Sequence, residues 1–371
     1  MSFALLLLAA MAPQATAKPA STQADEFLRR GISAQQQGDL NAAIAAYKQA
    51  VTLNPALGEA HANLGAALAA AGQFDDAIEE DKRAIELVPD TTSVRMNLAL
   101  AYYKKGDLEH ARLEFEAVHA ARPQDLNAAI LLAYSDLKLN RADDASRVLA
   151  PLAAANVANP DFQYVLALAQ IQSGNLTDGL PRMEKVASET RSPDAYVIAG
   201  QAHMDHGQYP QARADFDAAL QLAPTFPGLH TLAGMARDAN GDQLAARPEF
   251  EAALRDDPKD FNANLHLGGI LLKNGEIDAA RPLLETALQL QPNFPYARFE
   301  MARLNRQTGH YDEAVKTLEE LSKADPNWLD VHVELAALYY KLNRPQDGRH
   351  EREIVQQIEA KQQRAAPKPV Q

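Results

Sequence analysis

The chain has 371 residues, 49 of them acidic and 36 basic, and its formal net charge at pH 7 is −13. An acidic chain of this kind is not expected to bind nucleic acid, because contact with phosphates needs a basic face. The chain contains no cysteine, which excludes disulfides, thiolate zinc sites and cysteine nucleophiles. Its many alanine, leucine, glutamine and glutamate residues favour helix over sheet, because these side chains lose little rotamer freedom in a helix.

The N-terminal segment differs from everything that follows it. Residues 1–17 carry no charge, contain an apolar run from Phe3 to Ala12, and end in Ala15-Thr16-Ala17 just before Lys18. This pattern predicts a secretory signal peptide, a short linker over 18–23, and export across the inner membrane to the periplasm. No lysine or arginine precedes the apolar run, so an unprocessed leader and a cytoplasmic protein remain the alternative. No later apolar run is long enough to cross a membrane.

Beyond the leader, one register of about 34 residues organises the chain. Its clearest mark is a glycine or asparagine that recurs at steps of 34 residues, and once of 33. Such a residue ends a helix in the left-handed conformation, which most other side chains disfavour. The ten positions are Gly38, Gly72, Gly106, Asn140, Gly174, Gly207, Gly241, Gly275, Gly309 and Asn343.

Small residues occupy two further positions of every unit. One lies seven residues before the glycine or asparagine, as at Gly31 and Gly65, and the other lies five residues after it, as at Ala43 and Ala77. Each predicts a point where two helices approach closely. A bulky apolar residue four positions after the second small residue fills the space beside it. A proline closes most units, because it stops a helix.

Three departures from this register predict local differences. Asp81 occupies a position that is apolar or aromatic in most units, so the second unit is expected to pack less tightly. The fifth unit is one residue short, which predicts an irregularity near residues 187–193. Prolines at one shared position, Pro181, Pro248 and Pro282, predict second helices that start late or are kinked.

The pattern resembles the tetratricopeptide repeat, as in "ANLGAALAAAGQFDDAIEEDKRAIELVPD" and "LHLGGILLKNGEIDAARPLLETALQLQP". The resemblance implies an all-α fold, a right-handed α-solenoid superhelix of tandem helix-turn-helix repeats. About ten repeats would span 24–362, and 363–371 would be a disordered tail. The repeats would start near Ala24, Gly58, Thr92, Leu126, Pro160, Pro193, Pro227, Phe261, Pro295 and Leu329.

The resemblance also implies which residues face the concave groove, namely positions two, five, nine, twelve and thirteen of each unit. In the middle of the chain these positions are mostly apolar. If they are exposed, they form a trough that accepts a partner helix or an extended segment; the alternative is that they belong to the core between repeats. The apolar candidates are Met96, Leu100, Tyr103, Ile130, Tyr134, Leu137, Tyr164, Leu168, Ile171, Val197, Met204 and Met235.

Charged candidates complete this set. Lys104, Lys138, Lys273 and Lys341 fall at position thirteen, on the groove edge, where they are available to acidic groups of a partner. Arg303 and Arg306 make the groove polar near the C-terminal end. Chaperone-binding members of the family use a lysine and asparagine clamp for a terminal carboxylate. The corresponding positions of the first unit are Leu28 and Ile32, so the resemblance does not extend to that partner.

No constellation of residues predicts catalysis. The sequence has no Gly-rich phosphate loop, nucleophile elbow or zinc-protease helix. His203 and His206 have a spacing that can place both on one helix face, but a metal site would need further ligands, and solvated histidines at a helix end are the simpler interpretation. We therefore predict no cofactor and no metal.

The sequence thus predicts a non-catalytic adaptor or scaffold of the bacterial cell envelope that holds a protein or peptide partner. Two alternatives remain. The chain is a cytoplasmic regulatory module for a separately encoded enzyme, or it is the substrate-recruiting arm of an enzyme. The sequence names neither the partner nor the oligomeric state.

Overall fold

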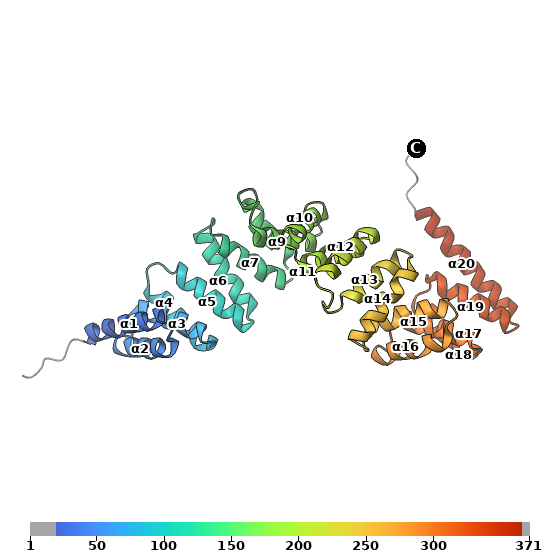
Figure 1. The fold of residues 1–371 in the computed structure, drawn as a ribbon, viewed down its shortest axis with the longest axis horizontal. Helices are drawn as coiled ribbons and strands as arrows, with labels where there is room; N and C mark the ends of the chain where they lie inside the picture. The colour runs from blue at the N-terminus through green and yellow to red at the C-terminus, as the bar shows by residue number, and fades with distance from the viewer. Residues whose placement is uncertain (1–19, 366–371) are drawn as a thin grey trace, which may run out of the picture. The chain divides into compact units, whose positions relative to one another are not determined.

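The computed structural model describes residues 20–365. These residues form an all-α helical-repeat solenoid of twenty α-helices, with no strand among them (Figure 1). The predicted signal peptide, residues 1–17, lies outside the described residues. The chain divides into two compact units, Met1–Met183 and Glu184–Gln371, and the boundary falls within helix α10 (Leu176–Thr190).

The first unit contains four complete helix pairs. Each helix packs against the next in the chain, and first helices of successive repeats also touch, as α3 touches α5 and α7 touches α9. Two short 3₁₀ turns, Ala150–Leu152 and Ala154–Asn156, follow α8. The helices are α1 (Ala20–Gln36), α2 (Leu40–Leu53), α3 (Gly58–Ala70), α4 (Phe74–Leu87), α5 (Thr92–Lys105), α6 (Leu108–Ala121), α7 (Leu126–Lys138), α8 (Ala142–Leu149) and α9 (Pro160–Gln172).

The second unit continues this scheme within itself. Its first helices also touch in succession, as α13 touches α15 and α15 touches α17. The helices after α10 are α11 (Pro193–Asp205), α12 (Tyr209–Leu222), α13 (Leu229–Ala239), α14 (Gln243–Asp256), α15 (Phe261–Lys273), α16 (Ile277–Leu290), α17 (Pro295–Gln307), α18 (Tyr311–Ala324), α19 (Leu329–Lys341) and α20 (Pro345–Ala365).

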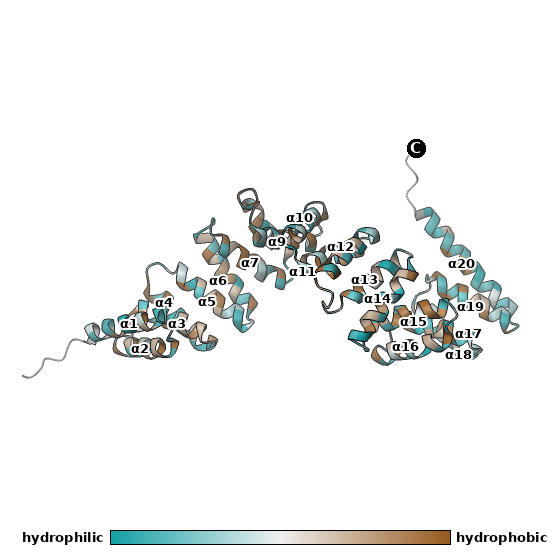
Figure 2. Cartoon of the chain, viewed as in Figure 1, coloured by the Kyte–Doolittle hydropathy of each residue, from teal (hydrophilic) through white to brown (hydrophobic). Residues whose placement is uncertain are grey.

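The two ends of the array differ slightly from the sequence prediction. Helix α1 already begins at Ala20, inside the segment expected to be a linker, and α20 continues to Ala365, inside the expected tail. Helix α20 is hydrophilic along most of its length (Figure 2). This polarity suits a terminal helix that covers the last repeat with one face and meets water with the other.

The residues at the helix ends have the conformations that the sequence predicted. All ten predicted glycine and asparagine positions have positive φ, including Asn140 at 57° and Asn343 at 55°. Side chains also cap several helix starts: Asp39 accepts a hydrogen bond from the Ala42 amide at 2.9 Å, and Asp260 accepts one from the Ala263 amide at 2.9 Å. Each cap satisfies an amide that the helix itself leaves unpaired.

The close approach of the paired helices depends on the predicted small residues. These lie at position eight of each repeat and face the bulky residue at position twenty-four. A Cβ atom added to Gly234 would lie 2.7 Å from the ring of the fully buried Phe250. A Cβ on Gly268 would lie equally close to Leu284. The missing side chain therefore makes room for the bulky one, and the two helices pack backbone against ring.

The irregularity predicted near residues 187–193 is confirmed, whereas the prediction for the second helices that contain prolines is partly wrong. Between α10 and α11 the chain turns through Arg191, a non-glycine residue with a φ of 52°, inside the predicted range of 187–193. The second helices that contain Pro181, Pro248 and Pro282 do not start late. They begin at Leu176, Gln243 and Ile277, five residues ahead of the proline.

Asp81 is the exception in the core of the first unit. Its side chain on α4 is 0% exposed, faces Gly65 on α3, and neither carboxyl oxygen has a hydrogen-bond partner. Burial, with a smaller contribution from Glu80, raises the pKa of Asp81 to about 8. A buried polar group without a partner is costly, so this position weakens the second repeat.

We predict that Asp81→Leu stabilises the protein, and more so at pH 8 than at pH 5. The folded protein keeps the Asp81 proton up to about pH 8, whereas the unfolded chain loses it near pH 4. Stability should therefore fall as pH rises between these values, by up to about 1.4 kcal/mol per pH unit. Urea unfolding at both pH values measures this, with the exposed Asp76→Asn on the same helix as the control. An equal effect of Asp81→Leu at both pH values would contradict the assignment.

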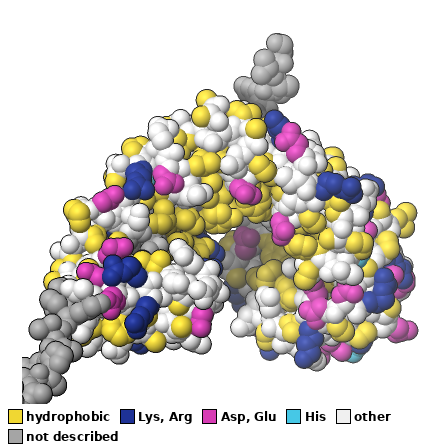
Figure 3. Space-filling view, turned by 60° about the vertical axis from the view of Figure 1, so that its left-hand side comes forward, with side chains coloured by type: hydrophobic (Ala, Val, Ile, Leu, Met, Phe, Trp, Pro, Cys, Tyr) yellow, Lys and Arg dark blue, Asp and Glu magenta, His cyan; other side chains and the backbone are white. Residues whose placement is uncertain are grey.

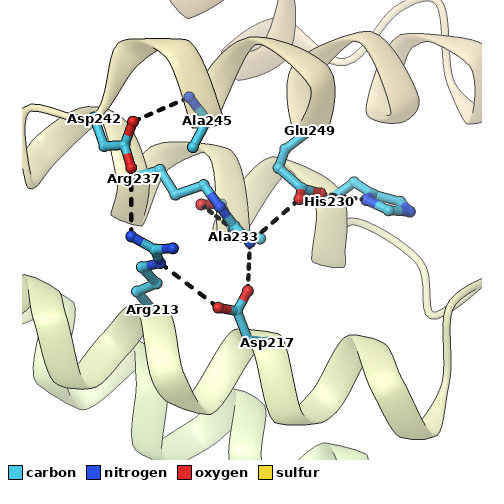
Figure 4. Close-up of polar contacts among 8 residues, drawn as sticks. All are labelled: Arg213, Asp217, His230, Ala233, Arg237, Asp242, Ala245 and Glu249. Atoms are coloured by element: carbon cyan, nitrogen blue, oxygen red, sulfur yellow. Dashed lines mark hydrogen bonds and ion pairs between the residues drawn. The ribbon is translucent and has the colours of Figure 1, made fainter.

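In the second unit, a charged network ties α12 to the following pair, α13 and α14 (Figure 4). At its centre Arg237, only 8% exposed, donates a hydrogen bond to Asp217 and lies 3.3 Å from Glu249. Glu249 also contacts His230 at 2.7 Å. Arg213 lies at the edge of the network, 3.6 Å from Asp217 and 3.4 Å from Asp242. The buried guanidinium thus holds carboxylates from two consecutive repeats.

We predict that Arg237→Met destabilises the protein by about 3 kcal/mol, because it leaves two carboxylates facing each other without their buried cation. Arg213→Met removes the same charge from a more exposed site of the same network, and should cost less than about 1 kcal/mol. Urea unfolding, followed by circular dichroism, compares the two variants. A similar loss in the free energy of unfolding for both variants would contradict the larger contribution expected of the buried arginine.

Candidate partner-binding surface

The apolar candidates of the first unit lie on the first helices α5, α7 and α9, and nearly all are half-buried. Their inner sides pack on the core: Met96, Leu100 and Tyr103 against one cluster of buried residues, and Tyr134 and Leu168 against another. Ile130 and Tyr164 pack against the second cluster as well, and Ile171 is also half-buried. These side chains therefore serve both core and surface, and Figure 3 shows apolar side chains reaching the surface in patches between charged ones.

Leu137 was predicted to face the groove, but it is only 6% exposed and belongs to the core. In the second unit, Val197 and Met204 are half-buried against one cluster of buried residues, and Met235 against another. No apolar candidate is fully exposed. In each unit, the remaining apolar candidates are therefore half-covered by the core and half-exposed on the first helices.

The charged candidates divide into two groups. Lys104 and Lys138 are exposed at the ends of α5 and α7. The arginines, in contrast, pair with carboxylates: Arg303 donates two hydrogen bonds to Glu300, at 2.9 and 3.0 Å, and Arg306 forms an ion pair with Glu334 at 2.6 Å. The positive charge of both arginines is thus largely balanced within the protein.

Around Arg303 the structure forms a cavity of about 320 Å³ on the first-helix face of the second unit. Most of its lining comes from the first helices α13, α15, α17 and α19, at positions that the resemblance assigns to the groove and at position six beside them. Ile270, at position ten, and Gln243, at the start of α14, complete it. Two apolar side chains in this lining are exposed, Tyr296 by 41% and Val333 by 47%. Exposed apolar groups inside a concave surface are the usual mark of a binding site.

Aromatic rings follow one another along the cavity. The rings of Tyr296 and Phe299 stack with their centroids 6.1 Å apart, and His266 lies 6.5 Å from Tyr296 on the other side. The Arg303 guanidinium sits 5.9 Å from the centroid of Phe299. This arrangement presents ring faces to whatever enters the cavity.

The charged side chains of the cavity are held in fixed pairs. His266 and Asp238 are hydrogen-bonded at 2.9 Å, and Glu300, only 1% exposed, is held by Arg303. Burial works to raise the pKa of Asp238, but hydrogen bonds from His266 and Gln243 outweigh it and lower that pKa. Burial raises the pKa of Glu300 in spite of Arg303. The walls are therefore preorganised by charge pairs that are already made.

A glycine keeps the cavity open. Gly269 occupies position nine of its repeat, and it is the only glycine at this position in the ten repeats. The atoms nearest to a Cβ added there belong to the Glu300 carboxyl group, the first at 3.5 Å, which is ordinary van der Waals contact. Because Gly269 lines the cavity, a larger side chain at this position would occupy part of it.

Of the residues that line this cavity, the sequence prediction named Lys273 and Arg303 but missed most of the others. Tyr296 at position two and Val333 at position five were already in the register that identified the other candidates. A second signal was also available at position six, where His266, Glu300 and Glu334 recur at steps of 34 residues. The pairing of His266 with Asp238 and of Glu334 with Arg306, which joins neighbouring repeats, is however visible only in the structure.

His203 lies in a separate cluster of the second unit. It contacts Asp215 through Nδ1 at 2.8 Å and approaches Glu184 through Nε2 at 3.6 Å, and these three residues could hold a metal ion by their spacing. His206, the predicted companion, instead bonds the Ala202 carbonyl at 2.8 Å. The interpretation of both as solvated histidines is therefore wrong for His203, which is only 5% exposed, and no sequence pattern pointed to Glu184 and Asp215.

By its architecture, the chain is a helical-repeat solenoid with a repeat of about 34 residues. Family models described as tetratricopeptide repeat match residues 102–169, 193–226, 231–297 and 271–332, and a TPR repeat model matches 35–72 and 67–106. The chain belongs to the tetratricopeptide-repeat family.

Named proteins from other organisms are similar to this chain over limited regions. The protein STIP1 homolog of Dictyostelium discoideum is 35% identical over 95 residues, which are 26% of this chain and 17% of that protein. The TPR repeat-containing thioredoxin TTL4 of Arabidopsis thaliana is 26% identical over 228 residues, 54% of this chain and 33% of that protein. The chain thus spans a third or less of the length of these relatives.

Among solved structures, the APC/C hetero-tetramer Cut9-Hcn1 is similar with a TM-score of 0.50 and 10% sequence identity, over 91% of this chain and 93% of that chain. At this identity the likeness concerns the fold alone. Within residues 20–365, no helix combines the length and the apolar character needed to cross a membrane.

Proposed function

We propose that this protein is a non-catalytic adaptor that holds an extended segment of a partner protein on the first-helix face, with its centre in the cavity around Gly269. The observation that carries the proposal is the coincidence of an open cavity with exposed Tyr296 and Val333 at groove positions of consecutive repeats. Half-buried apolar side chains on other first helices supply further contact area.

The chemistry of the cavity supports binding more than catalysis. Among the described residues that line it there is no serine, threonine or cysteine. Its most deeply buried carboxylate, Glu300, is engaged by Arg303. Paired groups of this kind fix the shape of a surface, whereas a catalytic base or nucleophile must be available to the substrate.

We further propose that the adaptor acts in the bacterial cell envelope. The support is the uncharged apolar leader over residues 1–17, which ends in a small-residue processing pattern. The alternative is a cytoplasmic regulatory module with an uncleaved leader, and the two proposals share the same binding face.

We predict that Gly269→Leu abolishes capture of the partner, because the new side chain fills the cavity. Ala279→Leu adds the same side chain to an exposed position of α16, a second helix of the same unit, and should leave capture unchanged. Tagged full-length protein and both variants would be cross-linked in cells and their bound proteins compared by mass spectrometry. Retention of the same proteins by Gly269→Leu, with unchanged circular dichroism, would contradict this binding site.

We predict that the mature protein begins at Lys18. Mass spectrometry of the N-terminal peptide, combined with cell fractionation, measures the cleavage and the compartment together. A protein that retains residues 1–17 and fractionates with the cytoplasm would instead support the regulatory module.

A further inference from the structure

We infer that the cavity around Gly269 accepts a basic side chain, arginine or lysine, from the partner segment. The inference rests on the proposed function and adds the chemical class of the residue that is bound. It depends on three properties of the cavity: its excess of carboxylates, an unpaired aspartate in its lining, and a partly exposed aromatic side chain.

The first property is the charge balance. The lining contains four carboxylates, those of Asp238, Glu300, Asp330 and Glu334, against the two permanent cations Lys273 and Arg303. Arg306 pairs with Glu334 from outside the lining, and even with this arginine the carboxylates remain in excess. A partner cation therefore compensates the cavity, whereas a partner carboxylate would add to the charge that is already in excess.

The second property is the availability of one carboxylate. Asp238 is shared by His266 and Gln243, Glu300 is held by Arg303, and Glu334 by Arg306. Asp330, in the first turn of α19, is exposed and has no ion-pair or hydrogen-bond partner among the described residues. The carboxylate that remains for a partner is therefore that of Asp330.

The third property is the ring face of Tyr296. This ring is partly exposed and stacks on Phe299, which already has the Arg303 guanidinium over its face. The protein thus contains, in the wall of the same cavity, an example of the contact that we infer for the partner. A cation over Tyr296 would gain the attraction of the ring, and Asp330 would supply a charge-assisted hydrogen bond.

The positive charge of Lys273 is the feature of the cavity that most favours an anionic partner. Its surroundings, however, weaken this interpretation. Its ammonium donates to the Gln243 side chain at 3.0 Å, and its charge acts on Asp238, whose pKa it helps to lower. Lys273 is thus largely engaged with the neighbouring repeat. The net charge of −13 over the whole chain likewise favours the approach of a basic partner.

The test uses the full-length protein and acetylated, amidated pentapeptides Ala-Ala-X-Ala-Ala, in which X is arginine, citrulline or glutamate. Citrulline keeps the shape of arginine without its charge. Binding would be measured by saturation-transfer NMR at low and high salt. We expect the arginine peptide to bind at least tenfold more tightly than the citrulline and glutamate peptides, and to lose affinity as salt increases.

Matched variants locate the binding. Asp330→Asn and Tyr296→Leu should each reduce the affinity for the arginine peptide by about tenfold. Asp312→Asn should not change it, because Asp312 is likewise an exposed first-turn aspartate but lies on α18, a second helix. Circular dichroism of each variant confirms that the fold is kept.

Several results would overturn the inference: equal binding of the arginine and citrulline peptides, tighter binding of the glutamate peptide, no binding of the arginine peptide, or no effect of Asp330→Asn. If any of these occurs while Gly269→Leu still releases the captured partner, the adaptor function stands and only the basic side chain is wrong. If Gly269→Leu releases nothing, the adaptor proposal itself fails.

Discussion

The close approach of two helices within each repeat is the constraint on which the rest of this structure depends. A glycine or alanine at position eight faces a bulky side chain at position twenty-four, as Gly234 faces Phe250. Both partners lie within sixteen residues of each other along the chain, so each repeat closes through local contacts. Because the inner face of the first helix is used for this closure and for contact with the next repeat, its other face remains for a partner.

The same constraint explains where the array is weak. At Asp81 a carboxyl group replaces the bulky apolar residue, and no donor compensates its burial. The second repeat therefore buries a polar group where its neighbours bury an apolar one, although its two helices approach each other closely at Gly65. Conversely, the buried Arg237 adds charge pairs to the apolar packing between two consecutive repeats. Stability in a linear array is a sum of such local terms, so it varies from repeat to repeat.

The fold could be predicted in detail because its determinants are local and repeated. The left-handed residues, the helix starts and the turn near Arg191 all follow from one register. Where the sequence prediction was wrong, the reason is that burial depends on neighbours outside the repeat. Leu137 occupies a groove position by its register, yet it is covered. Likewise, the register places Arg303 in the polar part of the groove, but it does not show that Glu300 and Glu334 already pair with its charge.

The residues at positions six and nine explain why the cavity forms on these repeats. In the three repeats that contain most of the apolar candidates, the residue at position nine is Leu100, Tyr134 or Leu168. These side chains cover the face between neighbouring first helices. At Gly269 nothing covers it, and the adjoining position-six residues are charged and paired. Charge pairs keep the walls at fixed distances and so prevent them from collapsing into the space that the glycine leaves. Because the side chains that line such a cavity are already ordered, they lose little conformational entropy when a partner binds. Less of the binding free energy is therefore needed to order the site.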